Sequence, residues 1–186
     1  MGDERVEVYD HGDKITNLIL ENGYEIIVEL GVWKGQTTKR ILKSPAAKYI
    51  KEYWAVDPYE PVGRGHGKLS KISASAEAIE IWEGIYTYAT RLMLYFPQLR
   101  VIRMTSEKLS ELFYQVKRQV DLVYIDADHH YLPVLSDIKC WLPLVRPGGI
   151  IAGHDYGPKY KGVKKAVDES FGDSIELDEN VWIKRL

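Results

Sequence analysis

The chain has 186 residues, of which 45% are hydrophobic and 28% charged, with a formal net charge of -2. This length suits one well-buried domain and is too short for two comfortable ones. Charges of both signs are interspersed without a basic run, which disfavours nucleic acid as a partner. No apolar run could span a bilayer, the N-terminus is too polar for a signal peptide, and the single cysteine, Cys140, fits a helical core position, so a reducing cytoplasm is the expected location.

The first elements are a helix and a buried strand. Apolar residues at helical spacing over 15–20 predict a short amphipathic helix that stops at Gly23. Residues 24–30 are apolar and rich in β-branched side chains, which is typical of a parallel strand covered on both faces. The helix is expected to pack on the sheet or to line a site from above.

A tight turn between Gly31 and Gly35 connects this strand to a second helix. Thr37 and Thr38 are expected to satisfy free amide groups as that helix begins. Such a turn can hold an anionic group and is also consistent with a plain connection. Its spacing matches neither the dinucleotide pattern G-x-G-x-x-G nor a phosphate loop, which argues against a nicotinamide oxidoreductase. Because the Glu29 carboxylate would repel a diphosphate, the ligand is expected to carry positive charge.

The second strand, 53–56, ends at Asp57. An acid at this strand tip can accept the two hydroxyls of a ribose, and Asp-Pro is equally common as a cap or a turn. The Pro/Gly-rich loop 58–67 follows as a candidate lid. Residues 69–96 then predict a long helix whose aromatic stripe suits the core or a dimer face.

The rest of the chain continues to alternate strands and helices. A third strand, 99–104, leads to Thr105 and Ser106 at a helix start, where Ser106 suits either a helix cap or an adenine contact. The remaining elements are strands 121–126 and 150–152, a turn at 146–149, helices 133–144 and 162–171, and a closing hairpin of 174–177 with 181–183. This order predicts an α/β fold with a doubly wound, Rossmann-like, mostly parallel sheet and an antiparallel C-terminal edge hairpin.

Polar side chains gather where the fourth and fifth strands end, at Asp126, Asp128, His129, His154 and Asp155. Ligands of open α/β sheets bind at this edge, and buried carboxylates repel one another unless a cation or a proton intervenes. A metal explains the pattern, although helix caps and solvated turn residues are also consistent with it. Oxygen ligands suit Mg²⁺ or Mn²⁺, and an imidazole favours Mn²⁺ or another transition metal.

His129 is the predicted general base, because an imidazole is largely neutral near pH 7. A metal that holds a substrate hydroxyl would lower the pKa of that hydroxyl. The resulting oxygen would attack a methyl sulfonium in line, with the protein contributing mainly by positioning.

Five segments carry a family resemblance. They are Glu-Leu-Gly-Val-Trp-Lys-Gly-Gln-Thr-Thr, Trp-Ala-Val-Asp-Pro-Tyr, Val-Tyr-Ile-Asp-Ala-Asp-His-His-Tyr, Leu-Val-Arg-Pro-Gly-Gly-Ile-Ile-Ala-Gly-His-Asp-Tyr and Gly-Val-Lys-Lys-Ala-Val-Asp-Glu. In this order they resemble the class I S-adenosylmethionine-dependent methyltransferases over about residues 25–171. The most similar branch includes macrolide-sugar O-methyltransferases and cephalosporin-hydroxylase-like proteins.

The resemblance implies a role for each matching position. Glu29, Gly31 and Gly35 would hold the methionine end of the cofactor, and Asp57 the ribose. Thr105 and Ser106 would meet the adenine side. Asp126 would contact the cofactor and, with His154 and Asp155, hold the metal, while His129 and Asp126 would be catalytic. Gln36, Met104 and His154 depart from the residues usual in the family, and the extra N-terminal domain of larger relatives has no counterpart.

The implied function is metal-assisted O-methylation of a hydroxyl on a small molecule, such as a sugar, a glycoside or a similar natural product. S-adenosylmethionine is the implied cofactor, with Mg²⁺ or Mn²⁺. The alternative is a protein of the same fold that binds S-adenosylmethionine without methyl transfer, as a binding module or a hydroxylase-like relative. Residues 1–186 are expected to form one domain with an N-terminal helix and a lid or helical insertion over about 58–97. The aromatic helix suggests a homodimer, and no membrane partner is expected.

Overall fold

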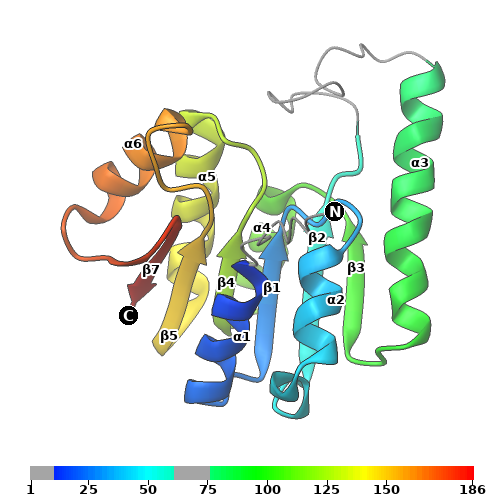
Figure 1. Cartoon of the computed structure of the whole chain (residues 1–186), viewed down its shortest axis with the longest axis horizontal. Helices are drawn as coiled ribbons and strands as arrows, with labels where there is room; N and C mark the ends of the chain where they lie inside the picture. The colour runs from blue at the N-terminus through cyan, green and yellow to red at the C-terminus, as the bar shows by residue number, and fades with distance from the viewer. Residues whose placement is uncertain (1–10, 61–75) are drawn as a thin grey trace, which may run out of the picture.

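A seven-stranded sheet organises the computed structural model, which describes residues 11–60 and 76–186 (Figure 1). The strands are β1 (Ile26–Leu30), β2 (Glu52–Asp57), β3 (Leu99–Arg103), β4 (Val120–Ile125), β5 (Val145–Gly153), β6 (Glu176–Asp178) and β7 (Val181–Arg185). Their spatial order is β3-β2-β1-β4-β5-β7-β6. The pairs among β1 to β5 are parallel, whereas β7 runs antiparallel to both β5 and β6. The predicted fold class, including the C-terminal edge hairpin, is confirmed.

The position of the site follows from this strand order. The chain builds the sheet outward from β1 through β2 to β3, then crosses back to place β4 on the other side of β1. In open α/β sheets, ligands bind outside the carboxyl ends of the strands at such a reversal. Every residue of β4 is buried, as is typical of a central parallel strand covered on both faces.

Helices cover both faces of the sheet. They are α1 (His11–Asn22), α2 (Gln36–Lys43), α3 (Ala76–Thr90), α4 (Ser106–Gln115), α5 (Tyr131–Trp141) and α6 (Lys161–Phe171). The first three pack on one face and the last three on the other (Figure 1). Successive strand side chains point to opposite faces, so that Ile27 joins the core under α1 and α2 while Val28 joins the core under α4 and α5. Among the described residues, no helix has both the length and the apolarity needed to cross a membrane.

Two predicted boundaries were wrong. The turn expected at 146–149 lies inside β5, because the strand starts at Val145 and pairs with β4 through an irregularity between Val120 and Leu122. Gly148 accommodates that irregularity with a φ of 78°. The helix expected over 133–144 runs from Tyr131 to Trp141, and a 3₁₀ turn at Leu142–Leu144 follows it.

The predicted long helix lies partly outside the described residues. Positions 69–75 and most of the candidate lid, 61–67, are among those not described, whereas α3 and a 3₁₀ turn at Arg91–Leu94 cover the rest. Trp82 and Ile85 of the aromatic stripe are buried in the core, which confirms its packing role. Ile81 and Tyr88 are exposed, and the homodimer stays a prediction.

Candidate active site

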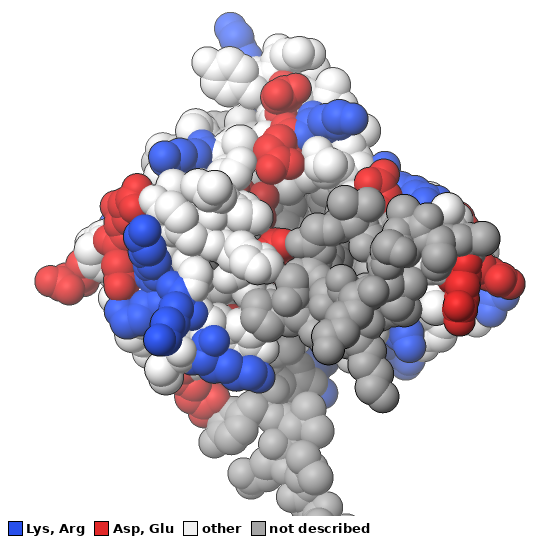
Figure 2. Space-filling view, turned by 90° about the horizontal axis from the view of Figure 1, so that it is seen from above, with Lys and Arg blue, Asp and Glu red and all other residues white. Residues whose placement is uncertain are grey.

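A cavity of about 400 Å³ opens at the reversal point, between the ends of β1 and β4. Its lining comes from separate elements, including His11 of α1, Glu29 of β1, Trp33 of the β1–α2 turn, Trp82 of α3 and the segment Asp126–His129 after β4. Seen from the carboxyl ends of the parallel strands, some acidic surface shows at a central hollow, and other acidic and basic side chains lie around the margin (Figure 2). The cavity lining includes the carboxyl groups of Glu29, Asp126 and Asp128. The cavity therefore suits a ligand that carries positive charge.

The β1–α2 turn fits tightly against the tip of β4 because residue 31 has no side chain. Gly31 has a φ of 85°, and its N–H donates to the Val56 carbonyl at 2.9 Å. A Cβ at this position would collide with the carbonyl oxygen of Asp126. Gly35, with a φ of 68°, caps the N-terminus of α2 without a side-chain hydrogen bond. The two glycines give the turn its left-handed φ values, and their contact with a cofactor stays a prediction.

The expectation that Thr37 and Thr38 cap α2 was wrong. Gly35 occupies the cap position, and both threonines lie within the first turn of the helix. The Thr38 hydroxyl donates to Glu29 Oε2 at 2.5 Å, and Thr37 Oγ1 lies 3.0 Å from His11 Nε2. The two hydroxyls therefore support side chains of the site instead of backbone amides.

Glu29 supplies a buried carboxyl group at the cavity, with 1% of the residue exposed. Its Oε2 accepts hydrogen bonds from Thr38 and, at 2.8 Å, from the Tyr53 hydroxyl. Burial raises the pKa of Glu29 to about 8, because it penalises the charged form more than these two hydrogen bonds stabilise it. The carboxylates of Asp126 and Asp57 add to the rise. A cationic ligand would favour ionisation of Glu29.

Asp57 is fully buried and holds backbone amides. Its Oδ2 accepts from the N–H groups of Val32 and Trp33, both at 3.0 Å, and its Oδ1 accepts from Tyr59 N at 2.8 Å. The carboxylate thereby fixes the β1–α2 turn. Its contact with ribose hydroxyls stays a prediction.

Thr105 and Ser106 lie where β3 leads into α4. Thr105 is the N-cap, with its hydroxyl accepting from Lys108 N at 3.4 Å. The Ser106 hydroxyl donates to Asp137 and accepts from Trp141 Nε1 at 3.2 Å, both on α5. Burial raises the pKa of that Asp137 carboxyl to about 7. The hydroxyl thus ties α4 to α5, and the adenine contact stays a prediction.

His154 lies beside both carboxylates that are predicted metal ligands, but Asp126, His154 and Asp155 do not offer three ligand atoms that all lie within 4.8 Å of one another. His154 Nδ1 is 3.6 Å from Asp126 Oδ1 and 3.3 Å from Asp155 Oδ1. Burial lowers the pKa of His154, but the two carboxylates outweigh burial and leave the pKa raised. Asp155 has a φ of 61°, a left-handed conformation that aspartate adopts more readily than most residues.

His129 contacts the carboxylate of Asp155. Its Nε2 lies 2.6 Å from Asp155 Oδ2, and its ring stacks on Tyr160 with the centroids 4.5 Å apart. Burial raises the pKa of Asp155, but the hydrogen bond from His129 and the positive charge of His154 outweigh burial and lower it. Two contacts therefore orient the imidazole predicted to be the base. The neighbouring Asp128 pairs instead with His130, at 2.7 Å from its Nδ1.

A family model described as a methyltransferase domain matches residues 28–156. The chain belongs to this methyltransferase domain family. The match spans the glycine turn, the Asp126–His129 segment and both residues at the end of β5, and it confirms the predicted resemblance to class I methyltransferases. None of the curated proteins matches the sequence.

Solved structures share the fold of this methyltransferase domain. The O-methyltransferase NovP is 19% identical, with a TM-score of 0.62 over 95% of this chain and 79% of NovP. CalS11, a TDP-rhamnose 3'-O-methyltransferase of calicheamicin biosynthesis, is 15% identical, with a TM-score of 0.60 over 94% of this chain and 77% of its own. MycE, in complex with Mg, SAH and mycinamycin VI, is 14% identical, with a TM-score of 0.54 over 93% of this chain and 48% of its own.

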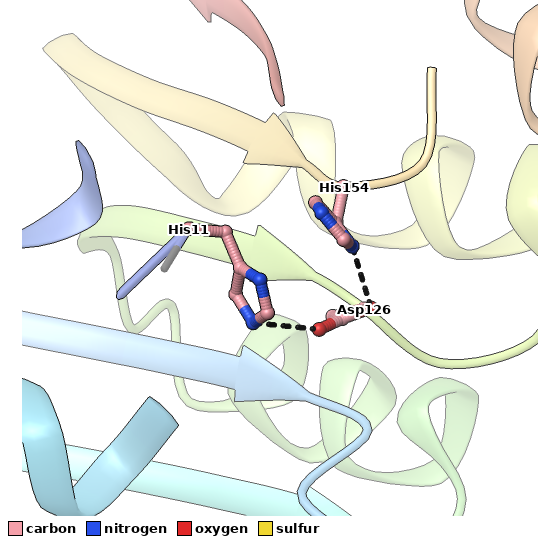
Figure 3. A group of neighbouring side chains, drawn as sticks. All are labelled: His11, Asp126 and His154. Carbon is pink, nitrogen blue, oxygen red and sulfur yellow. Dashed lines mark ion pairs between the residues drawn. The ribbon is translucent and has the colours of Figure 1, made fainter. Parts of the chain in front are cut away.

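The methyltransferase domain places one further side chain at the site that the sequence did not single out. His11, the first residue of α1, points toward Asp126, with Nε2 3.5 Å from Oδ2 (Figure 3). Its ring centroid is 4.2 Å from that of His154. The sequence predicted only that an N-terminal helix could line the site from above. It did not single out His11, because no sequence spacing relates residue 11 to the distant ends of β4 and β5.

Proposed function

We propose that this chain is an S-adenosylmethionine-dependent O-methyltransferase that methylates a hydroxyl of a small molecule, such as a sugar or a glycoside. The observation that carries the proposal is the pairing of His129 with Asp155 beside a cavity that contains the buried Glu29 carboxyl. The His129 imidazole can take a proton from a hydroxyl, and the Glu29 carboxyl favours a cationic cofactor. The names of NovP and CalS11 as O-methyltransferases, the latter acting on TDP-rhamnose, support this acceptor class.

The cofactor is expected to bind along the glycine turn. Gly31 lines the cavity where the methionine end would lie, and Glu29 faces the ammonium and sulfonium charges that S-adenosylmethionine carries. Asp57 supports this turn from below through the backbone bonds of Val32 and Trp33. The bound SAH of the MycE complex supports the same ligand class.

His129 is the proposed general base. With its Nε2 proton directed to Asp155, the imidazole carries its lone pair on Nδ1. Nδ1 takes the acceptor's hydroxyl proton while the oxygen forms a bond to the methyl carbon. S-adenosylmethionine, when bound, would supply the methyl group and would leave as the neutral thioether, with the electron pair of the carbon–sulfur bond on sulfur. Stacking on Tyr160 limits rotation of the ring, which favours a fixed direction of proton transfer.

A divalent metal is expected at the ends of β4 and β5. Asp126, His154 and Asp155 offer two carboxylates and an imidazole, with 3.3 and 3.6 Å between neighbouring donor atoms. When bound, a metal would hold the acceptor hydroxyl and lower its pKa. The Mg of the MycE complex supports this expectation.

We further propose that residues 1–186 act as one domain. The predicted N-terminal helix corresponds to α1, which brings His11 to the cavity, and the predicted insertion over about 58–97 includes α3, which brings Trp82. These two segments are expected to contribute to acceptor selection, because they bound the cavity outside the glycine turn.

The experiment incubates purified protein with S-adenosylmethionine, Mg²⁺ or Mn²⁺, and a panel of hydroxylated acceptors, and measures S-adenosylhomocysteine and methylated product by mass spectrometry. His129→Gln is expected to bind the cofactor but lose turnover. The matched control His130→Gln, whose histidine pairs with Asp128 instead, should retain turnover. Cofactor binding by the wild-type protein without turnover of any acceptor would favour the alternative of a binding module.

A further inference from the structure

The side chains of His11, Asp126 and His154 converge from three elements. His11 begins α1, Asp126 follows β4 and His154 follows β5 (Figure 3). All three can offer one ligand atom within 4.8 Å of one another. His11 and Asp126 line the cavity, whereas His154 lies behind them in a narrower pocket.

The distances in this group suit a shared ion better than direct hydrogen bonds. The two histidine nitrogens approach different oxygens of Asp126, His11 Nε2 at 3.5 Å from Oδ2 and His154 Nδ1 at 3.6 Å from Oδ1. A hydrogen bond between nitrogen and oxygen is about 2.7–3.2 Å long. Two ligands about 2.1 Å from one ion, at angles of 90–110°, lie about 3.0–3.4 Å apart, so both contacts need to shorten by only a few tenths of an ångström.

The chemistry of the donors points to a particular class of ion. Two imidazoles and one carboxylate form a donor set preferred by Fe²⁺, Mn²⁺, Co²⁺ and Zn²⁺, whereas Mg²⁺ prefers oxygen ligands. The two imidazole rings lie 4.2 Å apart and are tilted by 39°. A metal ion takes both imidazoles in their neutral form.

We propose that His11, Asp126 and His154 form a binding site for a divalent transition metal, with the imidazole of α1 as a direct ligand. The site keeps Asp126 and His154 from the metal position of the proposed function, and His11 takes the place of Asp155 as the third ligand. Its open coordination positions face the cavity, since His11 and Asp126 line it. The His11 nitrogen exchanges its 3.0 Å contact with the Thr37 hydroxyl for the metal.

Metal binding at this site also docks α1. The start of the helix is also held by the buried Ile15, which packs in the core, and by two ion pairs, Asp13 with Arg40 and Lys14 with Asp178. A bond from His11 to a metal held by β4 and β5 fixes the same turn of α1 against the carboxyl edge of the sheet. The metal is therefore expected to protect the backbone amides of this turn from hydrogen exchange.

The test uses the full chain, stripped of metal with a chelator and titrated with Co²⁺ while the d–d absorption is recorded. We expect one Co²⁺ per chain, bound more tightly than Mg²⁺, with a spectrum typical of nitrogen ligation. Loss of an outer-shell partner alone costs about 10- to 100-fold in metal affinity, so His11→Ala and His11→Gln should each weaken Co²⁺ binding at least about tenfold. The matched control His130→Ala should leave affinity and spectrum unchanged.

The inference is overturned if His11→Ala and His11→Gln bind Co²⁺ with the affinity and spectrum of the wild-type protein, or if the folded wild-type protein binds Mg²⁺ as tightly as Co²⁺. Absence of Co²⁺ binding by the folded wild-type protein also overturns it. Circular dichroism of the same samples checks folding. Calorimetric titration with S-adenosylmethionine, run in parallel, reports on the proposed function separately, because the proposed cofactor contacts at Glu29 and the glycine turn do not include His11.

Discussion

Glu29→Gln should change how the stability of the protein depends on pH. Because burial raises the pKa of Glu29 from its ordinary 4.5 to about 8, the folded chain retains a proton that the unfolded chain has lost between these values. The stabilisation is complete below pH 4.5 and is lost as the pH rises to about 8. A difference of about 3.5 pH units, at about 1.4 kcal/mol per unit, corresponds to about 5 kcal/mol.

Glutamine at position 29 keeps the hydrogen bonds but does not titrate. Its amide oxygen can accept from Thr38 and Tyr53 as Oε2 does. Urea denaturation of both proteins at intervals from pH 4.5 to 9 gives the free energy of unfolding, and every other titrating group is common to the two. The wild-type protein should lose several kcal/mol relative to the variant across this window. Parallel stability profiles would refute a buried, neutral Glu29.

Three further predictions concern Glu29 and the neighbouring β1–α2 turn. Asp57→Ala removes the acceptor of three backbone N–H groups and should lower the free energy of unfolding, measured by urea denaturation, by about 3 kcal/mol or more. The control Asp173→Ala, at an exposed position, should change this free energy by less than about 0.5 kcal/mol, and similar values for the two variants would contradict the supporting role of Asp57. Gly31→Ala places a side chain at a φ of 85°, where its Cβ collides with the Asp126 carbonyl, and should lower the free energy of unfolding by about 3 kcal/mol or more and weaken cofactor binding. An unchanged melting temperature would contradict the close approach of residue 31 to the Asp126 backbone. At pH 7, binding of a cationic cofactor should release up to about 0.9 proton from Glu29. The release would be measured as a dependence of the calorimetric binding enthalpy on the ionisation enthalpy of the buffer. If Glu29→Gln shows the same dependence, Glu29 is not the source of the released proton.

Local patterns predicted the fold because each decisive feature is encoded in adjacent residues. The buried run of β1, the φ-permissive Gly31 and the polar ends of β4 and β5 need no knowledge of the rest of the chain. Parallel topology then places the carboxyl ends of these strands together. Asp126, His154 and Asp155 could therefore be expected to lie close to one another before the structure was known.

Side-chain partners were harder to predict because they depend on tertiary packing. The sequence offered Thr38 as a helix cap, but a left-handed Gly35 takes that position and frees the hydroxyl for Glu29. His11 reaches the site because α1 packs on the sheet near β4, which Asp126 follows. This contact joins distant parts of the chain. Asp57 could equally have capped a turn or faced a ligand, and the choice depended on which amides lie nearby.

Calorimetric titration of the purified chain with S-adenosylmethionine tests the central claim most directly. Binding of one cofactor per chain, weakened in Gly31→Ala and retained in His129→Gln, is the expected result. A folded wild-type protein that shows no binding would contradict the claim that the cavity beside Glu29 is a cofactor site, and it would leave only the methyltransferase fold.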